Sequence, residues 1–119
     1  MAVAEVGAVV LDCPDPRALA DFYARVLGGS IEEQEDWVDV KVPGAPTLSF
    51  QAAPGYVPPQ WPSPEHSQQF HLDLTVEDLD AAEKEVLALG AKPLETEDRS
   101  RTFRVYADPA GHPFCLCAC

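Results

Sequence analysis

Residues 70–90, FHLDLTVEDLDAAEKEVLALG, decide the fold. Within Phe70–Val76 apolar and polar side chains alternate, which is the period-two pattern of a half-buried strand. Asp78 then stands at the N-cap position of a helix. Apolar residues at helical spacing follow it, namely Leu79, Ala82, Val86 and Leu89. Gly90 is typical of a helix end, so the stretch predicts one strand that leads into one helix.

The same pattern occurs earlier in the chain. Val6–Asp12 predicts a strand, and Asp15 with Pro16 predicts the start of a helix that ends at Gly28. Asp15 and Asp78 are 63 positions apart. Each helix is followed by three predicted strands, at 30–34, 37–42 and 47–51 in the first half and at 92–96, 102–107 and 112–117 in the second. The sequence therefore predicts an α+β fold of two tandem βαβββ modules.

A proline-rich stretch separates the two halves. Residues 53–69 contain five prolines, which lack a backbone donor and exclude both a helix and a central strand. We expect an extended linker there. The 119 residues suit a single domain, with module one at 1–52, the linker at 53–69 and module two at 70–119.

The charge of the chain excludes several classes of partner. Eight Lys and Arg against twenty Asp and Glu give a net charge of −12, which repels nucleic acids and anionic membranes. No apolar stretch is long enough to span a membrane, and the N-terminus has no basic leader. The four cysteines lack the spacing of a secreted disulfide framework or a zinc ribbon. We expect a cytoplasmic protein with reduced thiols.

Side-chain alternation predicts which residues share a face of each sheet. Leu72 and Leu74 should pack under a helix, as should Leu48 and Phe50, while His71 and Asp73 point the other way. The residues expected on that second face combine polar groups with aromatic rings, as ligand pockets do. They are Ala8, Val10, Trp37, Ser49, Gln51, His71, Asp73, Arg104, Tyr106 and Cys115.

Three segments resemble the vicinal oxygen chelate superfamily, which includes glyoxalases, bleomycin-resistance proteins and extradiol dioxygenases. They are VVLDCPDPRALADFYARVLGG, HLDLTVEDLDAAEKEVLALGA and YADPAGHPFCL. The resemblance is greatest to the small bacterial glyoxalase-like branch, much of which has no assigned reaction. It implies that two βαβββ modules form a curved sheet around a cavity, with the helices outside.

The resemblance also implies positions for metal ligands, and these are mostly substituted here. The ligand of the first strand falls on Ala8, and that of the fourth strand falls near Ser49 or Gln51. His71 keeps the usual histidine, and Cys115 replaces the last glutamate. His71 is thus the only matched ligand, and with Cys115 it could hold zinc only with help, for example from Asp73. A divalent metal is disfavoured on this count.

The sequence leaves two specific functions open, beside a third, that of a non-catalytic partner or regulatory domain. The first is a glyoxalase-like lyase or isomerase that acts on a small oxygenated compound, with His71 as the general base and Tyr106 or Arg104 as oxyanion stabiliser. The second is a metal-independent binding protein of the drug-sequestering, bleomycin-resistance type. Its pocket walls would be aromatic side chains, drawn from Trp37, Phe50, Tyr56, Trp61 and Tyr106. The partners expected are a small-molecule ligand and a second copy of the chain in a homodimer.

Overall fold

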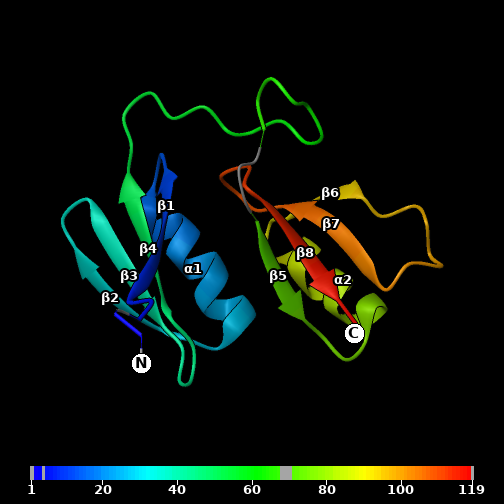
Figure 1. The fold of residues 1–119 in the computed structure, drawn as a ribbon, viewed down its shortest axis with the longest axis horizontal. Helices are drawn as coiled ribbons and strands as arrows, with labels where there is room; N and C mark the ends of the chain where they lie inside the picture. The colour runs from blue at the N-terminus through cyan, green and yellow to red at the C-terminus, as the bar shows by residue number, and fades with distance from the viewer. Residues whose placement is uncertain (1, 4, 68–70, 119) are drawn as a thin grey trace. The chain divides into compact units, whose positions relative to one another are not determined.

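The computed structural model describes residues 2–3, 5–67 and 71–118. Its chain forms two compact units, residues 1–56 and 57–119. Both units have the order strand, helix and three strands, so the predicted pair of βαβββ modules is confirmed (Figure 1). Phe70, which was predicted to open the fifth strand, and Cys119 lie outside the described residues.

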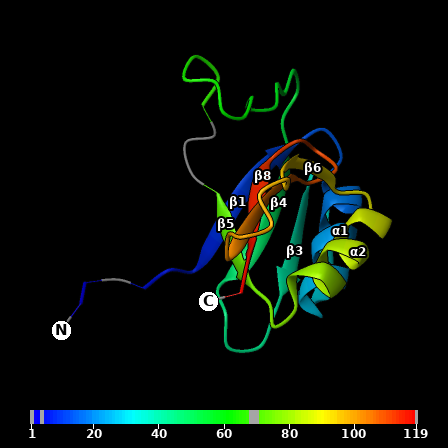
Figure 2. The same ribbon diagram turned by 90° about the vertical axis from the view of Figure 1, so that its right-hand side faces the viewer.

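The first unit contains one helix and one mixed sheet. Its elements are β1 (Ala8–Cys13), α1 (Pro16–Leu27), β2 (Ser30–Gln34), β3 (Trp37–Lys41) and β4 (Thr47–Ala52). The strand order is β1-β4-β3-β2, in which β1 runs parallel to β4 and the other pairs are antiparallel. The helix α1 lies against one face of this sheet (Figure 2).

The second unit repeats this topology. Its elements are β5 (Leu72–Thr75), α2 (Leu79–Ala88), β6 (Lys92–Glu95), β7 (Phe103–Ala107) and β8 (Pro113–Cys117). The strand order is β5-β8-β7-β6, and β5 runs parallel to β8. The helix α2 contacts this sheet through β8 and through side chains of β7.

Both helices begin as their sequences predict. The side chain of Asp15 accepts a hydrogen bond from the backbone N–H of Ala18 at 3.2 Å, and Asp78 does the same for Ala81 at 3.1 Å. These bonds satisfy backbone donors that the first turn of a helix leaves unpaired. At the other end of α1, Gly28 has a φ of 72°, a left-handed conformation that favours glycine.

One aromatic pair fills the core between helix and sheet in each unit. In the first unit Phe50 is fully buried and stacks on Tyr23 of α1, with ring centroids 5.6 Å apart. In the second unit Tyr106 is fully buried and stacks on Phe114 at 5.7 Å. Phe50 therefore lies under the helix, as its alternation predicted, and its use as a pocket wall is wrong.

The prediction that Arg104 and Tyr106 face away from the helix is also wrong. Arg104 pairs with Leu116 across β7 and β8, and Tyr106 pairs with Phe114, so all four side chains lie on one face. Arg104 donates to Asp80 of α2 at 2.9 Å, and the Tyr106 hydroxyl donates to Glu83 of α2 at 2.8 Å. Carboxylates on the helix allow a cationic side chain to lie in this otherwise apolar layer.

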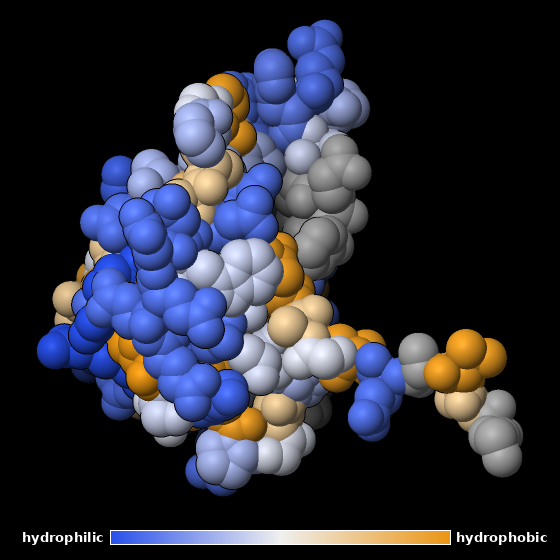
Figure 3. Space-filling model, turned by 90° about the vertical axis from the view of Figure 1, so that its left-hand side faces the viewer, coloured by the Kyte–Doolittle hydropathy of each residue, from blue (hydrophilic) through white to orange (hydrophobic). Residues whose placement is uncertain are grey.

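The described residues include no helix long and apolar enough to cross a membrane. The face of the molecule drawn in Figure 3 is largely hydrophilic, with small separate apolar patches. Such scattered apolar side chains are normal on a protein surface.

Candidate functional site

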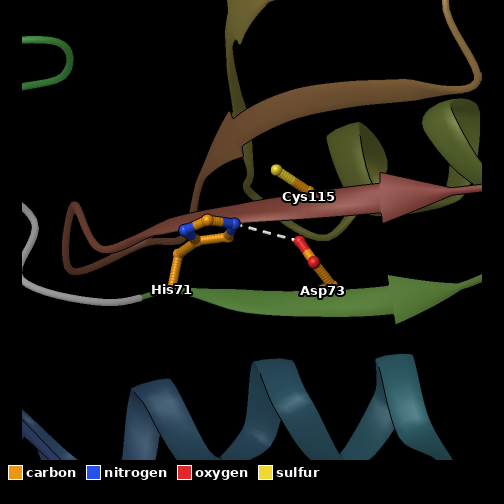
Figure 4. Close-up of side chains that lie close together, drawn as sticks. All are labelled: His71, Asp73 and Cys115. Atoms are coloured by element: carbon orange, nitrogen blue, oxygen red, sulfur yellow. Dashed lines mark ion pairs between the residues drawn. The ribbon is translucent and has the colours of Figure 1, made fainter.

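Three side chains of different chemistry meet on one face of the second sheet (Figure 4). They are His71, directly before β5, Asp73 in β5 and Cys115 in β8, and their ligand atoms all lie within 4.8 Å of one another. Asp73 and Cys115 are direct partners across the parallel strands. Leu72 and Leu74 alternate with them and pair with Phe114 and Leu116. The cluster therefore lies on the sheet face opposite α2.

His71 and Asp73 form the one polar contact drawn in this cluster. The imidazole Nε2 lies 3.0 Å from Oδ1 of Asp73, within hydrogen-bond distance. His71 is 30% exposed and Asp73 is 63% exposed, so both can be reached from solvent. A carboxylate in this position fixes the orientation of the imidazole ring.

Cys115 is the buried member of the cluster, with 5% of its surface exposed. Burial raises the pKa of its thiol to about 12, and the negative charges of Asp73 and Glu95 act in the same direction. At neutral pH the thiol is therefore protonated, which makes it a poor nucleophile by itself. The charges that act on it favour a cation instead, because the carboxylates of Asp73 and Glu95 both place negative charge near the sulfur.

Trp61 forms a wall beside this cluster. Its half-buried ring packs against the apolar cluster of Val105, Cys115 and Cys117. The centroid of the ring lies 6.4 Å from that of His71, in an edge-to-face arrangement with an interplanar angle of 78°. Four of the site residues predicted from the sequence come together here, namely Trp61, His71, Asp73 and Cys115.

The donor atoms of the cluster suit one class of metal ion. Zinc binds imidazole nitrogen, carboxylate oxygen and thiolate sulfur, and catalytic zinc sites have three protein ligands with one open position. Ligands of one tetrahedral zinc lie about 3 to 4 Å apart, so the ligand atoms of the cluster, which lie within 4.8 Å of one another, would have to move only slightly closer together. Ions that require six oxygens, such as Mg²⁺, fit a His, Asp and Cys set poorly. The cluster thus fits zinc or a similar borderline-soft ion.

Arg104 and Tyr106 belong to a separate network beneath α2. Burial raises the pKa of Tyr106, and its hydrogen bond to Glu83 raises it further. Among the described residues, Nε and Nη1 of Arg104 have no hydrogen-bond partner, although Nη1 lies 3.6 Å from a Glu83 oxygen. These groups are held between strand and helix, so they are not on the face of His71.

The predicted site residues of the first unit form a group of their own. Trp37 donates its indole N–H to Asp39 at 2.8 Å, and the hydroxyl of the buried Ser49 donates to the same oxygen at 2.6 Å. Gln51 pairs with Trp37 across β3 and β4, so it lies on the same sheet face. At the position of the first-strand ligand, Ala8 offers no donor atom.

Two polar partners were missed by the sequence analysis. Asp39 is two positions from Trp37 on one strand, and this same-face spacing could have indicated their contact. Glu95 accepts the indole N–H of Trp61 at 2.9 Å across a separation of 34 residues. A register shift between Pro93 and Glu95 interrupts the alternation there, so no sequence pattern predicted the face of Glu95.

Comparison with known sequences identifies the family. A family profile described as "Glyoxalase-like domain" matches residues 8–117, nearly the whole chain. The chain belongs to this glyoxalase-like family. The resemblance to the vicinal oxygen chelate superfamily is thereby confirmed. A search of curated protein sequences found no match.

Solved structures confirm the fold. A glyoxalase/bleomycin resistance protein/dioxygenase family enzyme from Burkholderia phytofirmans PsJN is 18% identical, with a TM-score of 0.70 and coverage of 95% of this chain and 97% of that one. The fosfomycin resistance protein FosX from Mesorhizobium loti is 12% identical, with a TM-score of 0.74 and coverage of 100% and 94%. A glyoxalase-related enzyme from Fulvimarina pelagi is 18% identical, with a TM-score of 0.73 and coverage of 98% and 89%. At these identities the likeness concerns the fold alone.

Proposed function

We propose that the second unit binds a small oxygenated compound at His71, Asp73 and Cys115 and acts on it as a glyoxalase-like lyase or isomerase. We further propose that these three residues hold a zinc-class ion there. The observation that carries the proposal is the meeting of nitrogen, oxygen and sulfur donors within 4.8 Å on one sheet face. Membership of the glyoxalase-like family supports the reaction class.

Each residue has a definite part in this proposal. His71 would bind the ion through Nε2, the atom that now contacts Asp73, and Asp73 would bind through a carboxylate oxygen. Cys115 would bind as the thiolate, since a thiol must lose its proton to ligate a metal. The ion would supply Lewis-acid polarisation of a carbonyl or hydroxyl oxygen of the substrate. Trp61 bounds the space that the substrate enters.

Metal content tests the proposal directly. Protein expressed with added Zn, Ni, Mn and Fe, and purified without a histidine tag, should retain about one zinc-class ion per chain, as a three-ligand site would. His71→Ala and Cys115→Ser should each lose that ion. Reconstitution of the metal-free protein with Co²⁺ should give the intense visible bands of a tetrahedral site and a near-ultraviolet thiolate band that Cys115→Ser lacks.

His66→Ala is the matched control for the loss of a histidine. His66 is exposed and lies in the proline-rich segment, where its backbone carbonyl accepts a hydrogen bond from Gln60 that the substitution leaves in place. His66→Ala should therefore bind metal as the wild type does. Metal at trace levels in the wild type, or equal loss in both histidine variants, would contradict the proposed ion.

A second function is favoured by the contact of Trp61 with His71. Without a metal, the ring of Trp61 and the carboxylates of Asp73 and Glu95 would bind small organic cations, as a drug-sequestering protein does. In this case His71, oriented by Asp73, would serve as a hydrogen-bonding or proton-transfer group. Quenching of Trp61 fluorescence by cationic aromatic compounds in Trp37→Phe protein, unchanged by a chelator, would distinguish this function from the first.

We also propose that the chain acts as a homodimer in the cytoplasm. Each four-stranded sheet ends in edge strands, β1 and β2 in one and β5 and β6 in the other, and such edges support association because they offer backbone groups for pairing. The buried thiol of Cys115 suits a reducing compartment.

A further inference from the structure

Within the second unit, the side chain of Trp61 attaches the proline-rich segment to the sheet. Trp61 packs against Val105, Cys115 and Cys117, and its indole N–H donates to Glu95 at 2.9 Å. The other carboxylate oxygen of Glu95 lies 3.2 Å from Arg101. The ring is therefore held both by apolar contact and by a directed hydrogen bond.

Two further contacts fix the backbone on either side of Trp61. The carbonyl of His66 accepts a hydrogen bond from the backbone N–H of Gln60 at 2.7 Å, which closes a turn around the tryptophan. Pro58 lies so close to Gly111 that a Cβ at position 111 would stand 2.7 Å from the Pro58 side chain. The segment is thus more than the spacer that its prolines predict, since it positions a ring at a chosen place.

That place is directly beside the His71, Asp73 and Cys115 cluster. The rings of Trp61 and His71 lie in an edge-to-face arrangement, and the Trp61 ring also packs against the apolar cluster that contains Cys115. Any ligand that contacts His71 and Cys115 together must share this space with the indole. The indole is rigid and bulky, so it excludes atoms from the side of the site that it occupies.

We propose that Trp61, clamped by Glu95, is the residue that sets ligand size at this site. It admits small oxygenated compounds with a slim end toward Cys115 and rejects those with a bulky group on that end. The site is the one assigned under the proposed function, and the inference rests on it for the identity of the ligand. The wall itself depends only on contacts of Trp61 with Glu95, His71 and the apolar cluster.

The test measures how the size of a reagent limits its access to Cys115. Metal-free protein is treated with N-ethylmaleimide or with the much larger N-(1-pyrenyl)maleimide, and modification of Cys115 is followed by peptide fragmentation in a mass spectrometer. Rates are divided by those of the unfolded protein, which removes intrinsic differences between the reagents. Trp61→Ala should raise the pyrenyl rate about tenfold more than the ethyl rate, because the indole no longer fills the approach. Trp61→Phe should give a smaller change in the same direction.

Matched variants separate the wall from general loosening of the fold. Trp37→Phe alters the tryptophan of the first unit and should leave the ratio of the two rates unchanged. Glu95→Ala removes the acceptor of the indole N–H and should raise the ratio, whereas Arg101→Ala removes the other partner of Glu95 and should not. Equal acceleration of both reagents in Trp61→Ala, or no change in either, would overturn the proposal.

The outcome is distinguishable from a failure of the proposed function. The labelling uses metal-free protein and no substrate, so it reports on the wall whether or not a metal is bound. A raised rate ratio with no retained metal would support the role of Trp61 and contradict the zinc-class ion. A retained metal with an unchanged rate ratio would support the zinc-class ion and contradict the role of Trp61.

Discussion

Glu83 shows how one carboxylate can hold a strand and a helix together. Burial alone would raise its pKa, but hydrogen bonds from Tyr106 and Arg99 and the charge of Arg104 outweigh that effect, so the pKa lies below its ordinary value. The side chain is 16% exposed, which limits the screening of these interactions by water. The ionised form is therefore stabilised in the folded protein.

The lowered pKa of Glu83 predicts a pH dependence of stability. A carboxyl group whose folded pKa is depressed contributes stability above its unfolded pKa of about 4.3 and loses that contribution as the pH falls through the folded value. Glu83→Gln should therefore be less stable than the wild type at pH 7, by about 1 to 3 kcal/mol. The difference in the free energy of unfolding should shrink between about pH 5 and pH 3.

Urea unfolding at a series of pH values measures this difference. Glu97→Gln, at an exposed position on the loop after β6, is the control and should change the free energy of unfolding little at any pH. A constant difference between wild type and Glu83→Gln across the acid range would show that the charge of Glu83 is not what stabilises the contact.

Single residues also show why the sequence predicted part of the site and missed the rest. His71 and Asp73 were predicted on one face because two apolar leucines mark the other face of β5. In β7 both sets of side chains are partly apolar, and Arg104 was assigned with Tyr106 to the pocket face of the sheet. The positive charge of Arg104 is balanced by Asp80 and Glu83. These carboxylates are distant in sequence, so alternation within the strand could not reveal that Arg104 faces the helix.

At the scale of elements, the turn from α1 to β2 depends on a close approach of backbone and side chains. A Cβ on Gly29 would stand 2.7 Å from Cγ1 of Val40 and 3.0 Å from the backbone oxygen of Lys41. The backbone atom cannot move aside without disturbing β3. Position 29 therefore requires glycine because there is no room for a Cβ atom. Its backbone conformation is not the reason, since its φ is not among the left-handed values found at Gly28 and Gly44.

Gly29→Ala should lower the free energy of unfolding by about 1 to 3 kcal/mol, the usual cost of forcing an extra methyl group into a packed region. The control is Gly7→Ala, where a Cβ would meet nothing within 4 Å. Its effect should be within about 0.5 kcal/mol. Thermal or urea unfolding of both variants makes the comparison, and an equal effect of the two substitutions would contradict the role given to space.

Element boundaries follow from local signals where those signals are strong. The sequence predicted β2 at residues 30–34, and the structure has the same bounds, because a glycine pair and a turn flank it. The helix starts were predicted because Asp15 and Asp78 cap them. The proline-rich segment was predicted only as a linker, because the contact of Trp61 with Glu95 joins residues far apart in sequence. Long-range contacts of this kind leave no periodic pattern.

At the scale of the whole molecule, charge and exposed strand edges act in opposite directions on self-association. The net charge of −12 makes two copies repel each other. The edge strand β1 carries Val10, which is 40% exposed, and an apolar side chain on an unpaired edge favours association. Salt screens the repulsion and leaves the apolar contact in place.

The proposed homodimer should therefore become stronger with salt. Sedimentation velocity at micromolar concentration should show a larger dimer fraction at about 0.3 M NaCl than at about 10 mM, because the screening length falls several-fold over that range. Val10→Lys should weaken the dimer at both concentrations, since lysine on an edge strand opposes pairing. Val57→Lys, at an exposed valine of the proline-rich segment, is the matched change in charge and should weaken it less. A monomer under all these conditions would remove the dimer, and equal effects of the two lysines would assign the association to net charge rather than to the edge of β1.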